Sequence, residues 1–355
     1  MAQLANGLLK AGFDVTVFVM YPGGPYRDTL EKAGIKIVSL EKRGRWDIAG
    51  FLCRLVRETR KENPEIFHSY LSTQNVIAVI LKPFLGDAKI VWGIRSAFMD
   101  LSRYDLLFRF SFRLEKYLSP LADLIITNSR SGRKMMIENG YHGENLITIP
   151  NGIDTKSFYP GREAGLALRK KWGADKNSKI IGVVGRIDPM KDHATFIQAA
   201  AMLVAKMDNV RFIFAGSGAT EYVAKMRSLA EEMKLSRHLV WAGDMEDMRA
   251  VYNALDINVL SSYGEGFSNA LGEAMACGVP CVVTDVGDLA WIVGDTGIVV
   301  APKNPTMLSS AILRMLDKPD DEIMNSGKLA RERIEKMFDI KTLTQNTTKA
   351  LEKLL

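Results

Sequence analysis

Two glutamates, Glu265 and Glu273, have seven residues between them and flank a stretch that can begin a helix. Ser268 or Asn269 can cap that helix, which would turn the backbone N–H groups of its first turn toward an anion. A helix N-terminus carries about half a positive charge and therefore suits a phosphate group. The two carboxylates could accept hydrogen bonds from sugar hydroxyls on either side of such a phosphate. From the spacing alone, two ordinary solvated glutamates remain an equally good interpretation.

A basic pair, Arg186 and Lys191, follows the apolar run Lys179–Val184. Arginine offers a planar fork of N–H groups to a phosphate, whereas lysine offers a point charge. Without further evidence, a solvated basic pair would be the better interpretation. Gly216, in the sequence Gly-Ser-Gly after another apolar run, is by itself a weak signal for a phosphate loop or a turn.

The second half of the chain alternates apolar runs with helical patterns. This alternation predicts a parallel sheet with helices on both faces, in which ligands bind at the carboxyl ends of the strands. The stretch from Glu265 to Glu273 would lie at such an end, in the right-handed crossover of a strand–loop–helix–strand unit. The expected strands are 179–184, 210–215, 239–241, 257–260, 281–284 and 297–300.

The stretch Glu-Gly-Phe-Ser-Asn-Ala-Leu-Gly-Glu, from Glu265 to Glu273, resembles the acidic signature of the retaining GT-B glycosyltransferases of family 4. Residues 183–192 are similar to that family's strand followed by an Arg and, five residues later, a Lys. Ile-Pro-Asn-Gly-Ile-Asp at 149–154 resembles its passage between domains, and Thr-Asp-Val-Gly-Asp at 284–288 resembles the loop after the acidic signature. Because these stretches occur in the family's order, the chain is identified as a member.

The resemblance implies an α/β fold of GT-B type, in which two Rossmann-like parallel-sheet domains face a central cleft. Residues 1–152 would form an acceptor-binding domain and residues 153–338 a nucleotide-sugar-binding domain. A helix over 339–355 would return to the first domain. The family usually has a strand and a Gly-rich loop before its first helix, whereas residues 1–11 already have the pattern of that helix. We therefore expect the first strand and loop to be missing, which would expose sheet edges.

The resemblance also implies transfer of a sugar from a UDP- or GDP-sugar co-substrate, with retention of configuration and without a cofactor or metal. The expected acceptor is a glycan or lipid-linked glycan in polysaccharide or lipopolysaccharide biosynthesis. An epimerase-like reaction on a nucleotide-sugar is a second enzymatic interpretation, but the order of the motifs favours transfer. The non-enzymatic alternative is a degenerate member that binds nucleotide-sugar without turnover, which the missing loop would support.

The resemblance assigns roles to individual residues. Arg186 and Lys191 would hold the donor diphosphate and stabilise it as it leaves. Glu265 would contact hydroxyls of the transferred sugar, Glu273 the ribose, and Met245 the base. The other expected donor-binding residues are Gly185, Gly216, Phe267, Ser268, Asn269, Ala270 and Leu271, of which the last five would offer backbone groups.

His68 and Arg95 end two apolar runs in the first half and are the candidates for the acceptor side. Related proteins often carry a His near this point that faces the transferred sugar, but a lone His is more often structural. The three cysteines form no metal-binding pattern and suit a reducing cytoplasm.

All of the excess positive charge lies in the first half of the chain. Residues 1–150 contain 21 Lys and Arg against 15 Asp and Glu, whereas residues 151–355 contain 26 of each. No nucleic-acid recognition motif accompanies this charge, so we expect no nucleic-acid partner. No apolar run is long enough to span a bilayer. The sequence therefore predicts a cytoplasmic protein, with attachment to the inner face of the plasma membrane as a further hypothesis.

Within 98–118, Arg109, Arg113 and Lys116 fall at i, i+4 and i+7 beside several phenylalanines. Such a basic amphipathic helix can lie on an anionic membrane surface. A helix packed on its own domain, with an arginine-lined outer face, is the alternative, and the pattern favours it slightly.

Overall fold

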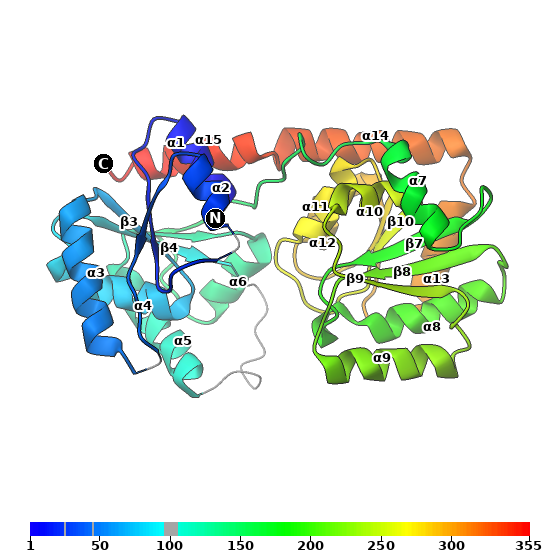
Figure 1. Ribbon diagram of the computed structural model, residues 1–355, viewed down its shortest axis with the longest axis horizontal. Helices are drawn as coiled ribbons and strands as arrows, with labels where there is room; N and C mark the ends of the chain where they lie inside the picture. The colour runs from blue at the N-terminus through cyan, green and yellow to red at the C-terminus, as the bar shows by residue number, and fades with distance from the viewer. Residues whose placement is uncertain (25, 45, 96–105) are drawn as a thin grey trace. The chain divides into compact units, whose positions relative to one another are not determined.

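The chain forms two compact α/β units in the computed structural model, which describes residues 1–24, 26–44, 46–95 and 106–355. Unit 1 consists of Met1–Gly152 together with Ile340–Leu355, and unit 2 consists of Ile153–Asp339. The chain thus leaves unit 1, builds the whole of unit 2, and then completes unit 1. Figure 1 labels many of the helices and strands of both units.

Six parallel strands form the sheet of unit 2: β7 (Lys179–Val184), β8 (Val210–Ala215), β9 (Leu239–Gly243), β10 (Ile257–Leu260), β11 (Cys281–Thr284) and β12 (Ile298–Val300). Their order across the sheet is β12-β11-β10-β7-β8-β9. The strands are apolar on both faces because helices cover both. This order makes β7 and β10 neighbours, so the loops that follow them leave the sheet at the same edge.

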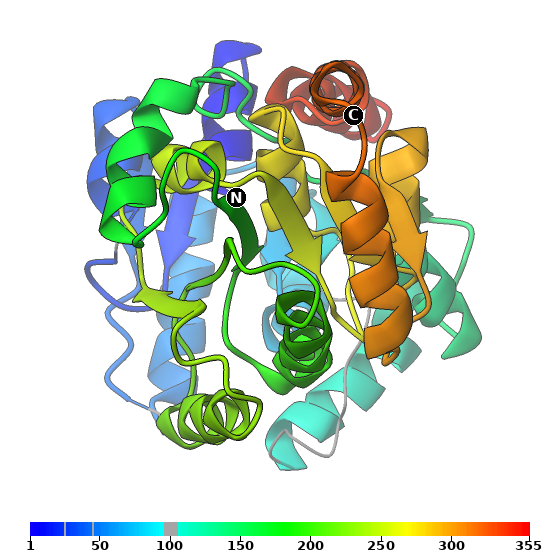
Figure 2. The same cartoon turned by 90° about the vertical axis from the view of Figure 1, so that its right-hand side faces the viewer.

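Eight α-helices accompany the sheet of unit 2: α7 (Arg162–Lys171), α8 (His193–Val204), α9 (Thr220–Glu232), α10 (Met248–Ala254), α11 (Asn269–Ala276), α12 (Leu289–Val293), α13 (Pro305–Leu316) and α14 (Asp320–Met337). Ile181 and Phe212 pack toward α8, α9 and α13, whereas the neighbouring Ile180 and Ile213 pack toward α7, α10, α11 and α12. The two helix layers are visible in Figures 1 and 2. The predicted strand–helix alternation is confirmed.

Unit 1 contains two separate parallel sheets. The strands are β1 (Thr16–Val19), β2 (Lys36–Ser39), β3 (Ile66–Tyr70), β4 (Lys89–Ile94), β5 (Leu124–Thr127) and β6 (Leu146–Thr148). β1 pairs with β2, and the larger sheet has the order β3-β4-β5-β6. Within the described residues, β1 pairs only with β2 and β3 only with β4, so each has one unpaired edge.

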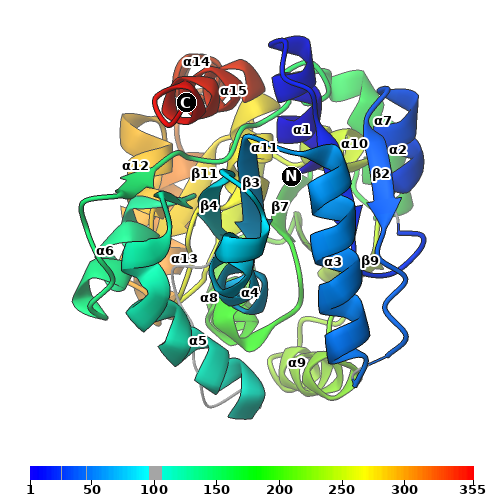
Figure 3. The same cartoon turned by 90° about the vertical axis from the view of Figure 1, so that its left-hand side faces the viewer.

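The described α-helices of unit 1 are α1 (Ala2–Lys10), α2 (Arg27–Lys32), α3 (Ile48–Glu62), α4 (Ser72–Leu81), α5 (Leu106–Leu118), α6 (Arg130–Glu138) and α15 (Ile340–Glu352). Leu4 and Leu8 of α1 pack with Val91 of the larger sheet, whereas Ala5 packs with Val17 of β1. α1 therefore holds the two sheets together, with α15 beside it (Figure 1). Helices α4, α5 and α6 pack on the opposite face of the larger sheet (Figure 3).

The outer face of α5 carries apolar side chains beside Arg113. Among its described side chains, the exposed apolar ones are Leu106, Phe110 and Tyr117, with exposed fractions of 81%, 61% and 72%. Of the predicted basic stripe, Arg113 is exposed, whereas Arg109 and Lys116 are half-buried. The predicted segment that precedes this helix, with Phe98, Met99 and Arg103, lies outside the described residues.

Candidate active site

An ion pair between Lys191 and Glu265 lies at the carboxyl edge of the unit 2 sheet. Nζ of the lysine contacts Oε1 of the glutamate, and the two side chains are only 18% and 9% exposed. The pair joins the loop that follows β7 to the loop that follows β10. The strands β7 and β10 are neighbours in the sheet. Ser262 Oγ also donates to Oε1 of Glu265, at 3.3 Å. The structure thus brings into contact the residues that we predicted for the diphosphate and for the sugar.

Further hydrogen bonds hold these two loops together independently of the ion pair. Ser261 Oγ donates to the Lys191 carbonyl at 2.9 Å, and the Tyr263 N–H donates to the Met190 carbonyl at 3.0 Å. Lys191 ends the short 3-10 helix η4 (Pro189–Lys191), which Asp188 caps by accepting from the Met190 N–H at 3.0 Å. The lysine backbone is therefore fixed while its long side chain can exchange partners.

Arg186 lies in the same loop as Lys191 and is exposed, and it forms no ion pair with a described residue. Its loop packs directly against the loop after β8. Gly216 has φ +139°, and a Cβ there would lie 2.1 Å from the carbonyl oxygen of Gly185. Any side chain at position 216 would therefore push the Arg186 loop out of place. Gly216 has this packing reason whether or not it also contacts a phosphate.

Helix α11 begins beside the Glu265 loop. Ser268 is its cap and accepts from the Leu271 N–H at 3.4 Å, which decides between the two predicted caps. Asn269 is exposed and Ala270 half-buried, whereas the side chains of Phe267 and Leu271 are buried in the core. The Leu271 N–H already donates to Ser268 and the residue is fully buried, so a ligand at this helix start would meet Asn269 and Ala270 first. The predicted backbone contacts of Phe267 and Leu271 stay predictions.

Glu273 is half-buried in α11 and accepts a hydrogen bond from the hydroxyl of Tyr252, at 2.9 Å. Burial raises the pKa of Glu273 above its ordinary value of 4.5, and the hydrogen bond from Tyr252 opposes that shift. Our reading of the sequence missed Tyr252, because it lies 21 residues away on α10. Tyr252 fixes one carboxylate oxygen, Oε2, and so orients the group that we predicted for the ribose.

Met245 follows β9 and is half-buried, with its side chain packed against the core of unit 2. The side chain therefore borders the carboxyl edge of the sheet on the β9 side. Its predicted contact with a nucleotide base stays a prediction.

In unit 1, His68 and Arg95 gather around Tyr70 at the carboxyl ends of β3 and β4. The His68 ring stacks on Tyr70 with ring centroids 4.5 Å apart, and the Arg95 guanidinium lies 5.1 Å from the same ring. Tyr70 pairs with Gly93, where a Cβ would lie 2.5 Å from the tyrosine ring. Burial, followed by the charge of Arg95, lowers the pKa of His68 to about 3. His68 is therefore neutral near pH 7.

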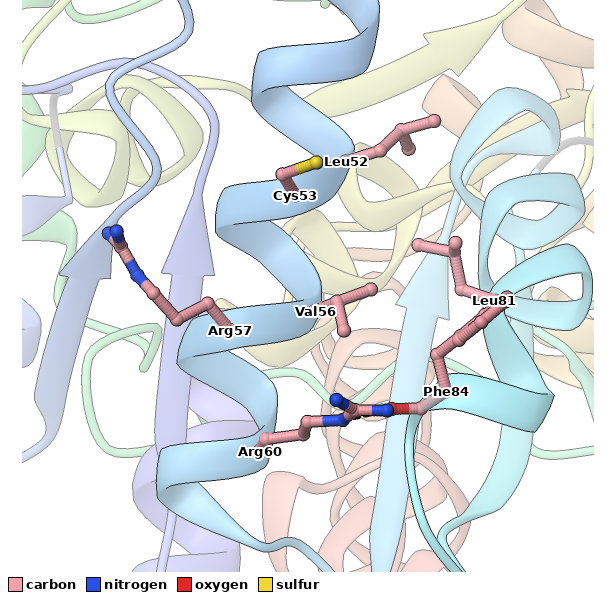
Figure 4. Close-up of a pocket in the computed structure, with 7 residues that line it drawn as sticks. All are labelled: Leu52, Cys53, Val56, Arg57, Arg60, Leu81 and Phe84. Carbon is pink, nitrogen blue, oxygen red and sulfur yellow. Dashed lines mark hydrogen bonds between the residues drawn. The ribbon is translucent and has the colours of Figure 1, made fainter.

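An apolar groove of about 490 Å³ lies elsewhere on unit 1, between α3 and the α4–η1 segment, where η1 is Lys82–Phe84 (Figure 4). It is lined by Leu52, Cys53, Val56, Arg57, Arg60, Leu81 and Phe84. Arg60 Nε donates to the Phe84 carbonyl at 2.9 Å across one end of it. None of the predicted site residues lines this groove, so we assign it no part of the site.

The described part of the chain contains no group of three or more His, Cys, Asp or Glu side chains that could hold a metal ion. None of the helices that it contains is both long enough and apolar enough to cross a membrane. The three cysteines are free thiols, and burial raises the pKa of both Cys277 and Cys281 to about 12.

Two family models match the chain one after the other. Residues 1–157 match the model described as Glycosyltransferase Family 4, and residues 178–318 match the model described as Glycosyl transferases group 1. The chain belongs to the group 1, family 4 glycosyltransferases. The second match includes Arg186, Lys191, Glu265 and Glu273, so the predicted family is confirmed over the stretch that carries the acidic signature.

This family 4 chain is similar to proteins with different acceptors in their names. It is 26% identical over 297 residues to the UDP-Gal:alpha-D-GlcNAc-diphosphoundecaprenol alpha-1,3-galactosyltransferase of Escherichia coli, covering 81% of this chain and 75% of the relative. It is 28% identical over 209 residues to the D-inositol 3-phosphate glycosyltransferase of Acidothermus cellulolyticus, covering 55% of this chain and 46% of the relative. The chain thus spans about half the length of this inositol-phosphate relative.

Solved structures show the fold of this family 4 chain. The Anabaena protein Alr3699/HepE, in complex with UDP, is similar with a TM-score of 0.85 and 19% identity, covering 99% of this chain and 96% of that one. Sucrose-phosphate synthase from Thermosynechococcus elongatus has a TM-score of 0.84 and 22% identity, covering 99% and 92%. At these identities the likeness establishes the fold alone. The predicted GT-B class, with two parallel-sheet α/β units, is confirmed.

Proposed function

We propose that the chain transfers a sugar from a UDP- or GDP-sugar to an acceptor, with retention of anomeric configuration. The observation that carries this proposal is the buried contact between Lys191 and Glu265 beside the Ser268-capped start of α11. A sugar diphosphate needs positive charge for its phosphates and a hydrogen-bond acceptor for its hydroxyls. The carboxyl edge of the unit 2 sheet supplies both within one small site.

Donor binding would rearrange the ion pair. An incoming diphosphate competes with Glu265 for Lys191, because both are anions in reach of the same ammonium group. Once Lys191 turns to the phosphate, the Glu265 carboxylate can accept hydrogen bonds from the sugar. Without donor, Lys191 and Glu265 thus compensate each other's charge. When the donor binds, its diphosphate would become the partner of Lys191 and its sugar hydroxyls the partners of Glu265.

The same charges would promote bond breakage. As the bond between the anomeric carbon and the diphosphate oxygen breaks, negative charge grows on the leaving diphosphate. Arg186, Lys191 and the N-terminus of α11 are positive groups that stabilise this charge most strongly when it is fully developed. These groups would therefore accelerate the reaction as well as bind the donor.

The test is a thermal-shift panel of nucleotide-sugars, followed by a hydrolysis assay with the donors that bind. We expect a UDP- or GDP-sugar to raise the melting temperature and to release nucleoside diphosphate slowly without acceptor. Arg186→Ala should abolish that release, whereas Arg314→Ala, at an exposed position of α13, should not. Binding without release would indicate a non-catalytic nucleotide-sugar-binding protein. If no nucleotide-sugar shifts the melting temperature, the proposed function is wrong.

The acceptor that we propose is a lipid-linked glycan in polysaccharide or lipopolysaccharide biosynthesis. The support is the Escherichia coli relative, whose name specifies a diphosphoundecaprenol-linked sugar and of which this chain covers 75%. A lipid-linked acceptor would require the protein to work at a membrane surface. The outer face of α5 offers a means of reaching one.

We propose that α5 attaches the protein reversibly to an anionic membrane. Leu106, Phe110 and Tyr117 lie four and seven residues apart along the exposed side of the helix, with Arg113 between them. Apolar and aromatic side chains can enter the interface, and each nearby basic residue adds about 1 kcal/mol at low salt. The one acidic residue of this helix, Glu115, is buried and hydrogen-bonded to Asn75 and Tyr141. Its carboxylate is therefore not exposed on the helix surface, where it would repel an anionic membrane.

Co-sedimentation with anionic and neutral vesicles tests this attachment. Wild type should pellet with anionic vesicles at low salt and be released as salt rises. Two variants should remain in the supernatant, Leu106/Phe110/Tyr117→Gln and Arg109/Arg113/Lys116→Gln. A matched control, Met324/Leu329→Gln, removes exposed apolar residues from α14 and should pellet like wild type. Equal behaviour of all four proteins would exclude α5 as the membrane contact.

A further inference from the structure

Arg95 carries a positive charge that no described carboxylate compensates. Its Nη1 donates to Oδ1 of Asn151 at 2.9 Å, and its guanidinium lies over the ring of Tyr70. Asn151 is a neutral amide, and burial raises the pKa of Tyr70, so that side chain stays a neutral phenol at pH 7. These partners orient the guanidinium without neutralising it.

The structural arginines of this chain have different surroundings. Arg169, which is 7% exposed, donates to the carbonyls of Ala254 and Ser178 and forms an ion pair with Asp256. Arg331 donates to three carbonyls and forms an ion pair with Glu335. A guanidinium has five N–H donors. In Arg169 and Arg331, most of these donors bind backbone carbonyl or carboxylate oxygens. Arg95 is held at the carboxyl end of β4 with no such set of acceptors among the described residues.

A further feature beside Arg95 favours an anion. Nε2 of His68 is buried and has no hydrogen-bond partner among the described residues. A neutral imidazole carries one N–H group, which can donate a hydrogen bond to an anion. The Arg95 cation and this buried nitrogen, which has no partner among the described residues, therefore lie around Tyr70 at the ends of β3 and β4.

We propose that Arg95 binds a phosphate or carboxylate group of the acceptor, with Tyr70 and Asn151 as its positioning residues. This inference rests on the proposed function and adds to it the chemical class of the acceptor, which is anionic. The donor diphosphate has its own cations in unit 2, Arg186 and Lys191, so the cation of unit 1 is available to a second anion. A planar, charged fork suits either a phosphate or a carboxylate in a bidentate arrangement.

Inorganic phosphate is the probe, and the protein is first saturated with UDP so that the cations of unit 2 are occupied. The dissociation constant of phosphate is measured by thermal shift at constant ionic strength, with chloride as the balancing ion. The proteins are wild type, Arg95→Gln, Arg95→Lys and the matched control Arg57→Gln, which removes an exposed arginine from the same unit. The affinity of each protein for UDP is measured separately by calorimetry.

We expect Arg95→Gln to raise the phosphate dissociation constant about tenfold or more, as the loss of charge-assisted hydrogen bonds predicts. Arg95→Lys should retain affinity within about threefold because it keeps the charge. Arg57→Gln should match wild type, and UDP affinity should be unchanged in all variants. Equal phosphate affinity in wild type and Arg95→Gln would overturn the proposal.

A loss of UDP affinity in Arg95→Gln would also overturn the proposal, because the guanidinium would then belong to the donor diphosphate. Failure of wild type to bind any nucleoside diphosphate is a different result, which counts against the proposed function. In that event the comparison of phosphate binding between wild type and Arg95→Gln can still be made without UDP. The two failures are therefore distinguishable.

Discussion

Lys191→Met is expected to weaken binding of the donor diphosphate strongly and to destabilise unit 2 at the same time. The diphosphate loses its charge-assisted contact, which should lower UDP affinity roughly thirtyfold or more. Glu265 is left as a poorly solvated carboxylate without its cation, which should cost about 2–4 kcal/mol of unfolding free energy. UDP calorimetry and urea unfolding measure the two effects separately.

The double variant Lys191→Met/Glu265→Gln is the control that separates these effects. It removes both charges, so the stability lost in Lys191→Met should be largely regained. UDP binding should not return, because the ammonium group is still absent. If Lys191→Met kept the UDP and GDP affinities of wild type, Lys191 would not be the diphosphate ligand.

Glu265→Gln is expected to separate nucleotide binding from sugar transfer. UDP no longer has to compete with the Glu265 carboxylate for Lys191, so its affinity should rise about fivefold, equivalent to about 1 kcal/mol. The sugar loses hydrogen bonds to a charged acceptor, so donor turnover should fall on the order of a hundredfold. Calorimetry with UDP and a hydrolysis assay with the bound donor measure these opposite changes.

Glu273→Gln is the matched variant for this experiment. It replaces the carboxylate of the other glutamate of the acidic signature by an amide, as Glu265→Gln does. If Glu273 binds the ribose, its loss should weaken UDP itself. Equal losses of UDP affinity in Glu265→Gln and Glu273→Gln would show that the assigned division between sugar and ribose is wrong.

Local chemistry made part of the site predictable from the sequence. A side-chain cap acts on N–H groups two or three residues away, so a helix start at Ser268 or Asn269 could be inferred without any tertiary information, and the structure shows that Ser268 is the cap. Continuous apolar runs likewise predicted the strands of unit 2. A strand that is buried on both faces is apolar at successive positions, so its own residues are enough to identify it. These predictions needed only neighbouring residues.

Contacts between distant residues could not be inferred in the same way. Lys191 and Glu265 are 74 residues apart, and their contact depends on β7 and β10 being neighbours, which no local pattern specifies. The contact of Tyr252 with Glu273 depends likewise on how α10 and α11 pack. For α5, periodicity identified a basic stripe, but only the packing of Phe112 and Glu115 into the core decides which stripe faces outward.

The position of α15 has a consequence for how the protein is made. Helix α1 packs against both sheets of unit 1, and α15 packs beside α1 with Leu351 in the same apolar cluster. During synthesis the whole of unit 2 leaves the ribosome after the sheets of unit 1 and before α15. Domains commonly fold in order from the N-terminus as they emerge, but here the first unit lacks one of its own helices until the second is complete. Unit 1 therefore cannot complete its apolar cluster around α1 until the whole of unit 2 and then α15 have been synthesised.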